Sequence, residues 1–263
     1  MTLFGPEAGA PAQPLVRVRM TVAYDGRGFH GFAVQDGIRT VGGELTTALR
    51  RALRHDVTLT CAGRTDSGVH ASGQVVSFDA EAARFDPDAL QKSVNSQLGP
   101  VVVVRDAAVA ADPCFDARRS ALARRYRYLV LNRAVPDPFL AATSWHVKTP
   151  LDLRAMQAAG DALIGEHDFT SFCRSHPGGC NVRRVLDLSW RDAGDGLLRF
   201  EVEASSFCQQ MVRSVVGTMV DMGRGRRRAG EMTSILRARS RSAAGQPAPP
   251  HGLTLWSVRY ADD

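Results

Sequence analysis

The alternation of apolar and polar side chains in the first half of the chain predicts a short series of strands and helices. Residues 15–24 alternate between apolar side chains and arginine or threonine, which is typical of a half-buried strand. Residues 41–54 repeat apolar side chains at helical spacing. A second helix is expected from Asp86-Pro87, an N-cap followed by proline at the first helical position, to about residue 98. Further strands are expected at 57–61, 75–78 and 101–109.

This order of elements is that of a ferredoxin-like unit, with helices on one face of a mainly antiparallel sheet. The second half alternates in a similar way, with strands at 122–131, 182–190, 197–204 and 253–260 and helices at 151–164, 207–223 and 230–238. We therefore predict an α+β protein made of two ferredoxin-like α/β units, residues 15–112 and 113–263, whose mainly antiparallel sheets form a central cleft. Residues 1–14, rich in proline and small residues, are expected to be a disordered tail.

The composition is that of an ordinary globular protein, with 44% hydrophobic and 23% charged residues. No apolar run approaches the roughly eighteen residues that a membrane span needs, and the start lacks a basic segment followed by an apolar one. We therefore expect a cytoplasmic protein that does not contact a membrane. Five cysteines without a C-x-x-C pair favour reduced thiols over a disulfide framework. No metal site is expected, because the spacing of Cys173, Cys180, His167 and His176 fits no standard zinc pattern.

The basic residues are concentrated in two segments of a chain whose net charge is +6. Residues 117–133 hold six arginines and no acidic residue, and residues 221–241 hold seven arginines against two acidic residues. Positive charge gathered in this way favours contact with phosphates, most economically those of a nucleic acid. Two solvated basic faces that bind nothing are the alternative.

The loop between the β-branched runs 57–61 and 75–78 has the most mixed chemistry in the chain. It carries Arg64, Asp66 and His70 among three glycines. A loop held by two strands is a usual place for reactive groups, so Asp66 is a candidate catalytic carboxylate. An aspartate that bonds to the backbone of its own turn is the plainer alternative. His70 is expected to be structural.

Two positions in the second half are candidates to complete a site. Arg213 falls at the edge of the buried arc of the helix expected at 207–223, so its stem can pack while its guanidinium reaches a cleft. A cation in that position would help to keep a buried aspartate ionised. Tyr126 and Tyr128 share one face of the strand expected at 122–131. Ordinary packing is the alternative for all three residues.

Residues 63–70, followed by 73–76, resemble the active-site loop of the TruA family of tRNA pseudouridine synthases. This resemblance implies an isomerase without metal or cofactor that acts on uridines at positions 38, 39 and 40 of the tRNA anticodon stem-loop. It also implies a homodimer in which one tRNA touches both subunits. The resemblance runs through nearly the whole chain from residue 16, in the segments 24–26, 115–118, 123–128, 169–172, 207–213 and 248–253.

The resemblance also implies roles for single residues. Asp66 matches the catalytic nucleophile, Arg213 matches the arginine that pairs with it, and Arg64 matches an arginine that contacts the RNA, where it could fill the stack left by a flipped uridine. The resemblance selects Tyr126 rather than Tyr128 as the residue that contacts the target uracil. We expect Tyr126 to stack on the uracil rather than to remove the C5 proton, because a phenol with an ordinary pKa of about 10 is a poor base. Further RNA contacts are expected from Arg84, Phe115, Asp116, Ala117, Arg118, Arg119, Arg124, Arg125, Arg174, His176, Pro177, Gly178, Gly179 and Cys180.

Two other functions stay open at this point. One is a non-catalytic RNA-binding protein that keeps the fold and the basic surface and acts as a chaperone of tRNA folding. The other is a hydrolase that uses Asp66 to cleave a nucleoside glycosidic bond. Replacement of Asp66 separates the three functions, because only the synthase would lose pseudouridine formation while it still binds RNA.

Overall fold

The computed structural model of the protein describes residues 14–174 and 180–261. Its first half contains the elements that the apolar pattern predicts, in the expected order. Helix caps set two of their boundaries, because the Thr40 side chain accepts a hydrogen bond from the amide of Gly43 and the Asp86 side chain accepts two at the start of the next helix. The elements are β1 (Leu15–Tyr24), α1 (Val41–Leu53), β2 (Thr60–Cys61), β3 (His70–Glu81), α2 (Pro87–Leu98) and β4 (Val102–Val109).

The second half is built in the same style, with differences at element ends. The helix expected from residue 207 begins at Met211, because Gln210 has a left-handed backbone (φ 64°) that a continuous helix excludes. Two short strands, β6 and β7, escape prediction because their few residues do not alternate. The elements are β5 (Ala123–Leu131), β6 (Trp145–His146), α3 (Leu153–Asp161), β7 (Gly165–Asp168), β8 (Val182–Asp192), β9 (Leu197–Ala204), α4 (Met211–Gly223), α5 (Glu231–Ala238) and β10 (Leu253–Arg259).

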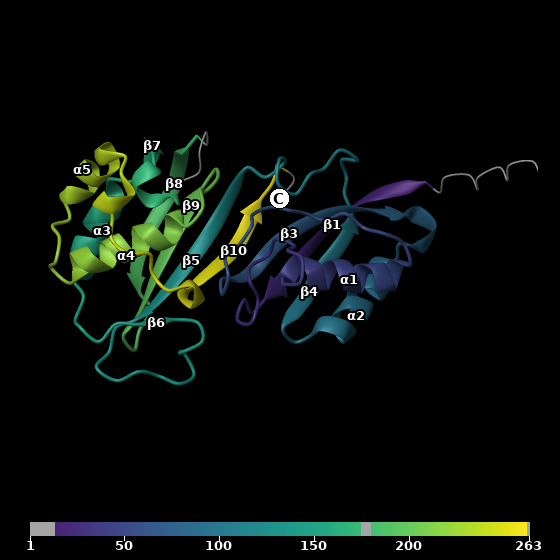
Figure 1. Ribbon diagram of the computed structural model, residues 1–263, viewed down its shortest axis with the longest axis horizontal. Coiled ribbons are helices and arrows are strands. Elements are labelled where there is room, and N and C mark those ends of the chain that lie inside the picture. The colour runs from purple at the N-terminus through teal and green to yellow at the C-terminus, as the bar shows by residue number, and fades with distance from the viewer. Residues whose placement is uncertain (1–13, 175–179, 262–263) are drawn as a thin grey trace, which may run out of the picture.

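The strands of both halves form one ten-stranded sheet in the order β4-β1-β3-β10-β5-β9-β8-β7, with β2 and β6 paired to β3 and β5. The pairing is antiparallel except between β10 and β3 and between β5 and β6. Helices α1 and α2 gather along one end of this sheet, and α3, α4 and α5 gather along the other (Figure 1). The expected α+β class with mainly antiparallel strands is confirmed, and the sheets of the two expected units are joined edge to edge.

Strand β10, from the end of the sequence, makes that junction. Leu255 is paired with Ala71 of β3 on one side and with Tyr126 of β5 on the other. Two strand spacings place β3 and β5 about 10 Å apart across β10. The loop that carries Asp66 leads directly into β3, so this spacing between strands sets the distance from the loop to the face of β5.

The N-terminal tail that the sequence analysis expects falls largely outside the described residues. Within the described part of the chain, no helix is both long enough and apolar enough to cross a membrane.

Candidate active site

Buried side chains beneath the Asp66 loop fix its first residues. Gln74, which is fully buried, donates from Nε2 to the carbonyl of Gly63 at 2.6 Å and accepts from the Gly63 amide at 3.3 Å. The hydroxyl groups of Tyr24 and Thr65 share a buried hydrogen bond of 2.8 Å. A loop whose main chain and side chains are both bonded to the strands beneath it holds its next residue, Asp66, in a defined place.

The segment before α1 covers the outer side of the same loop. The amide of Phe32 donates to the carbonyl of Thr65 at 3.1 Å, and the amide of Gly68 donates to the carbonyl of Phe29 at 3.3 Å. At Gly31 the backbone has φ +91°, and a Cβ atom there would lie 2.7 Å from the Thr65 carbonyl oxygen. Only glycine fits both demands, so this residue type allows the two segments to meet closely.

His70 connects three segments of the chain. Within the part of the chain that the structure describes, its hydrogen bonds and ion pair go to residues other than Asp66. Its Nδ1 lies 3.2 Å from the amide of Gly26 and 3.2 Å from Oδ1 of Asp25, and its Nε2 lies 3.1 Å from the carbonyl of His251. Burial is the main cause that lowers the pKa of this imidazole. These contacts agree with the structural role expected for His70.

The carboxylate of Asp66 faces the guanidinium of Arg213, with 3.7 Å between Oδ2 and Nη1. The Asp66 side chain is 26% exposed and that of Arg213 is 15% exposed, so the pair is only partly shielded from water. Arg213 is held from behind, because its Nε donates to the carbonyl of Ala248 at 2.7 Å. The first turn of α4 and the loop before β10 together therefore aim this cation at the loop that carries Asp66.

Burial raises the pKa of Asp66 above its ordinary value, and three neighbours oppose that rise. They are the charge of Arg213, a hydrogen bond from the Gln209 side chain and the charge of Arg174. The carboxylate is thus drier than a surface aspartate, and its neighbours offset part of the cost of keeping it charged, which suits a nucleophile. Gln209 has no expected role in the sequence alone. It lies four residues before Arg213 in the segment 207–213, which carries the family resemblance, and this place could have marked it as a candidate.

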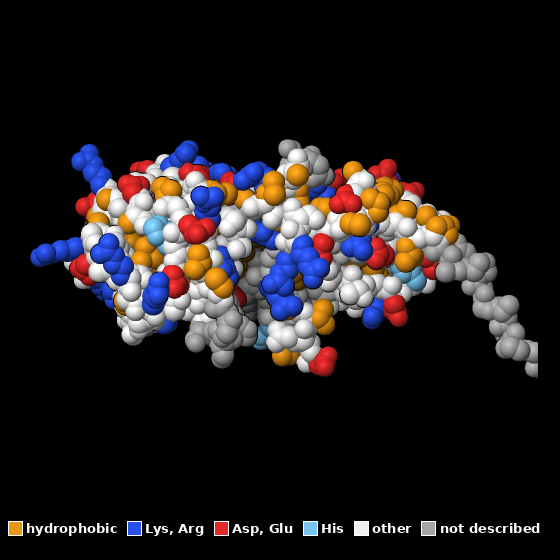
Figure 2. Space-filling view, turned by 90° about the horizontal axis from the view of Figure 1, so that it is seen from above, with side chains coloured by type: hydrophobic (Ala, Val, Ile, Leu, Met, Phe, Trp, Pro, Cys, Tyr) orange, Lys and Arg blue, Asp and Glu red, His pale blue; other side chains and the backbone are white. Residues whose placement is uncertain are grey.

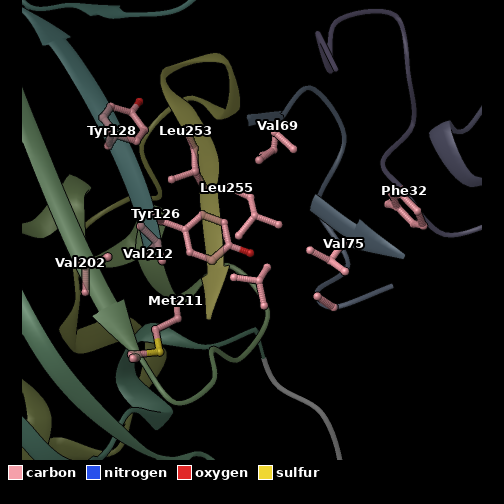
Figure 3. Packing of buried hydrophobic residues seen from close by; sticks show 14 of the residues in the cluster. Phe32, Val69, Val75, Tyr126, Tyr128, Val202, Met211, Val212, Leu253 and Leu255 are labelled. Carbon is pink, nitrogen blue, oxygen red and sulfur yellow. The ribbon is translucent and has the colours of Figure 1, made fainter. Parts of the chain in front are cut away.

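Tyr126 lies on the buried face of β5 beside the Asp66 loop. Its ring makes an edge contact with Phe207, with 5.0 Å between ring centroids, and a Cβ added to Gly63 would lie 3.6 Å from its hydroxyl. In Figure 3 this hydroxyl points away from β5, toward the side where Val69 and Val75 lie. Burial is the largest cause that raises the pKa of Tyr126, and the charge of Asp66 adds to the rise. A phenol in this state is a poor base and a suitable surface for stacking.

Phe115, Asp116 and Ala117 build a turn that presents two arginines. The ring of Phe115 is buried against Tyr260, and the amide of the buried Ala117 donates to Ser77. Oδ1 of Asp116 accepts hydrogen bonds of 2.8 Å from the amides of both residues that follow Ala117. Those residues, Arg118 and Arg119, are exposed, as is Arg64 in the catalytic loop. Figure 2 shows basic side chains at the edge of a hollow near the middle of the molecule.

Three other arginines of the expected RNA-binding set lie in different surroundings. All five N–H groups of Arg124 are bonded to main-chain carbonyls, so its guanidinium faces the interior rather than a ligand. Arg125, on the opposite face of β5, is paired with Glu203 at 2.6 Å. Arg84 follows the end of β3, whereas the Asp66 loop precedes its start. A strand of twelve residues is about 40 Å long, so Arg84 lies far from Asp66. It pairs there with Glu81 at 3.0 Å.

The expected loop 174–180 is described only at its ends. The amide of Arg174 donates to the carbonyl of Gln209 at 3.0 Å, which places it beside the Asp66 site. Cys180 is exposed and its thiol is free. The remaining residues of that expected RNA contact, His176, Pro177, Gly178 and Gly179, lie outside the described residues.

The expectation of reduced thiols throughout is wrong for one pair. Cys173 and Cys208 form a disulfide, with 5.7 Å between their Cα atoms. The bridge links the residue before Arg174 to the residue before Gln209. Sequence spacing could not reveal it, because the two cysteines are brought together only by the packing of the segment after β7 against the start of α4.

Asp66 and Arg213, the carboxylate in the glycine loop and the guanidinium that opposes it, lie in two stretches of sequence that match a class of RNA-modifying enzymes. The model of a protein family described as tRNA pseudouridine synthase matches residues 20–118 and 159–261. The chain belongs to the tRNA pseudouridine synthase family, whose members are isomerases that convert uridine in tRNA to pseudouridine.

Relatives that cover almost the whole chain agree with this assignment. The protein named tRNA pseudouridine synthase A of Halalkalibacterium halodurans is 44% identical over 241 residues, which cover 90% of each chain. Its namesakes in Brevibacillus brevis and Bacillus subtilis are 42% and 40% identical and cover 93% of this chain and 99% of their own. The crystal structure of the archaeal box H/ACA sRNP Nop10-Cbf5 complex covers 89% of this chain and 46% of that chain, with a TM-score of 0.36 and 13% identity.

Proposed function

We propose that the protein isomerises uridines at positions 38, 39 and 40 of the tRNA anticodon stem-loop and that Asp66 is its nucleophile. The observation that supports Asp66 most directly is its pairing with Arg213 at 3.7 Å within a loop held by Gln74 and Tyr24. A turn-forming aspartate would have no need of a partly buried cation from another part of the chain.

The reaction requires that the bond between uracil N1 and ribose C1′ break and that C1′ rejoin the ring at C5. In one route, a carboxylate oxygen of Asp66 attacks C1′ of the ribose and displaces N1 of the uracil, and C5 of the turned base then attacks C1′ and expels the carboxylate. In the other, the carboxylate adds to C6 of the ring and is eliminated from C6 after C1′ has moved from N1 to C5. In both routes the C5 proton is lost once the bond between C1′ and C5 has formed, and N1 gains a proton. Arg213 stabilises the charged carboxylate before attack, and Tyr126 stacks on the uracil and limits its movement while it turns.

The spacing of the sheet supports this arrangement of parts. The Asp66 loop leads into β3, and Tyr126 lies on β5. Strand β10 lies between these two strands, whose axes are therefore about 10 Å apart. We propose that the Asp66 loop and the ring of Tyr126 contact one uracil bound over β10, and that flipping this uracil out of the RNA stack costs a few kcal/mol for the loss of stacking.

We propose that exposed arginines around the loop hold the phosphates of the RNA, while buried ones build the site. Arg118 and Arg119 are presented by the Asp116 turn, and Arg64 and Arg174 flank Asp66. Arginines in such positions read shape and backbone rather than bases, which suits a target at several neighbouring positions. The family resemblance leads us to propose a cytoplasmic homodimer that binds the anticodon arm across both subunits.

The test compares Asp66→Asn and Asp66→Ala with Asp56→Asn, a matched control at an aspartate in the segment after α1 whose side chain is 91% exposed. Pseudouridine at each anticodon-arm position is measured by chemical labelling, and tRNA affinity is measured in parallel. We expect both Asp66 variants to bind tRNA while they form no pseudouridine. Pseudouridine at undiminished levels would exclude Asp66 as nucleophile. Modification outside positions 38–40 would contradict the proposed target, and release of free uracil would favour the hydrolase.

A further inference from the structure

Arg124 is a buried cation whose hydrogen bonds go to main-chain carbonyls. It is 8% exposed. The carbonyl of Ala62 accepts from Nε at 3.2 Å and from Nη2 at 2.9 Å. Nη1 donates to the carbonyls of Ala121 at 3.2 Å and Ser205 at 2.8 Å. Nη2 also donates to the carbonyl of Arg118 at 2.6 Å. These five bonds account for all five donors of a guanidinium, so none is left for a phosphate.

The carbonyls belong to three segments that surround the candidate active site. Ala62 lies at the start of the loop that carries Asp66, and Ser205 begins the segment that carries Phe207 and Gln209. Arg118 and Ala121 belong to the basic turn before β5. Arg124 itself stands two residues before Tyr126 on β5, on the same buried face of the strand. One side chain therefore connects the parts that bear the nucleophile, the stacking ring and the phosphate-binding turn.

No other amino acid could make this set of bonds. The guanidinium is planar and its five donors have fixed directions, whereas a lysine ammonium has three donors and no fixed plane. Burial without a carboxylate partner lowers the pKa of Arg124, chiefly through desolvation. A buried charge persists when it is well hydrogen-bonded, and a replacement would leave several carbonyls without partners.

We propose that Arg124 is a positioning residue for the isomerisation, which holds the Asp66 loop and the Phe207 segment at a fixed separation on either side of Tyr126. The proposal rests on the function proposed above for Asp66 and Tyr126. Arg124 does not touch the substrate. It acts by keeping the groups that do so within the small tolerance that covalent catalysis allows, where a misplacement of about 1 Å costs about a hundredfold in rate.

The test uses Arg124→Lys and Arg124→Met in the full chain, with Arg127→Met as the matched control. Arg127 lies on the opposite face of β5, where it pairs with Glu201 and stacks on Trp256. Four quantities are measured for each variant: single-turnover rate on bound tRNA, tRNA dissociation constant, its dependence on salt, and the melting temperature.

We expect Arg124→Met to lower the single-turnover rate by about a hundredfold, with an intermediate loss in Arg124→Lys. The dissociation constant should change by less than about threefold and the salt dependence should stay that of the wild type. Arg127→Met should lower the melting temperature without loss of rate, which separates positioning from stability alone.

Two results would overturn the proposal. A weaker dissociation constant with a salt slope smaller by about one would make Arg124 a phosphate contact. A lower melting temperature with an unchanged rate on bound tRNA would make it a residue of general stability. If Arg124→Met does not fold, Arg124→Lys decides by the same two comparisons. Failure of the proposed function is recognised separately, because the wild type would then form no pseudouridine in the anticodon arm.

Discussion

Oδ2 of Asp66 lies 3.7 Å from Nη1 of Arg213, although the two residues belong to opposite halves of the chain. Burial raises the pKa of this carboxylate, and the guanidinium is the largest of the influences that lower it again. As the proposed nucleophile, Asp66 must be ionised, so we expect activity to fall as the pH drops through its raised pKa. On this proposal, the balance between burial and one cation sets the acid limit of the reaction.

Replacement of Arg213 by methionine should move that limit. Without the guanidinium the pKa of Asp66 rises further, so the acid limb of the profile of kcat/KM against pH should move to higher pH. The rate at neutral pH should fall by about a hundredfold or more, as when one preorganised charge-stabilising group is removed. Arg213→Lys keeps a positive charge and should give a smaller displacement. An acid limb that stays in place in Arg213→Met would show that the pair does not control ionisation.

Tyr126 should act through its ring more than through its hydroxyl. Tyr126→Phe keeps the edge contact with Phe207 and should retain most of the affinity for tRNA and a measurable rate. Tyr126→Ala removes a stacking surface worth about 1–3 kcal/mol and should raise KM and lower kcat. Steady-state kinetics of both variants provide the measurement. A wild-type rate in Tyr126→Ala would refute the stacking role.

Affinity for tRNA should depend steeply on salt, because the proposed contacts are arginines on phosphates. Arg118→Ala and Arg119→Ala should each lower the slope of log affinity against log salt by about one. Arg50→Ala is the control, since this arginine lies on α1 and pairs with Asp56 at 3.0 Å. Filter binding over a salt series measures the slopes. Equal slopes in all three variants would remove the Asp116 turn from the RNA contact.

The buried amide of Gln74 should matter for both stability and rate. Gln74→Leu leaves the amide and carbonyl of Gly63 without their partner, which costs about 1–3 kcal/mol for each unsatisfied buried group. We expect a lower urea midpoint and a slower turnover from a less ordered Asp66 loop. Gln35→Leu, at an exposed position, serves as the control. An unchanged turnover in a folded Gln74→Leu variant would mean that the loop holds its shape without this side chain.

The disulfide between Cys173 and Cys208 predicts how many thiols of the protein react before and after reduction. Denatured protein that has not been reduced should react at three thiols, those of Cys61, Cys114 and Cys180, and reduced protein should react at five. Mass spectrometry after alkylation gives both counts. Cys208→Ser should lower the free energy of unfolding by about 2–4 kcal/mol. Five reactive thiols before reduction would show that the bridge does not form in solution.

Local patterns were enough to predict most of the elements and to single out three candidate residues of the site. The alternation in 15–24 and the Asp86-Pro87 start of α2 depend on burial and on capping, which neighbours in sequence determine. Motif and periodicity made Asp66, Arg213 and Tyr126 candidates, the resemblance selected them, and their proposed roles stay predictions. The one-sheet arrangement could not be predicted, since strand order depends on contacts between distant residues.

The same limit explains the residues whose surroundings differ from expectation. Arg124 and Arg125 are neighbours in a basic segment, yet alternation along β5 turns one toward buried carbonyls and the other toward Glu203. Their partners, Ser205 and Glu203, come from β9 and the residue after it, about eighty positions later in the chain. A count of charges in one segment contains no information about such partners.

The position of β10 between β3 and β5 has a consequence for how the protein matures. Asp66 and Tyr126 are made early, but their strands share no direct pairing until residues 253–259 slide between them. All three proposed reactive residues, Asp66, Tyr126 and Arg213, therefore precede the strand that sets their spacing within the sheet. A chain that lacks residues 253–259 would keep these side chains but lose the element that joins the two halves of the sheet, so we expect it to be inactive.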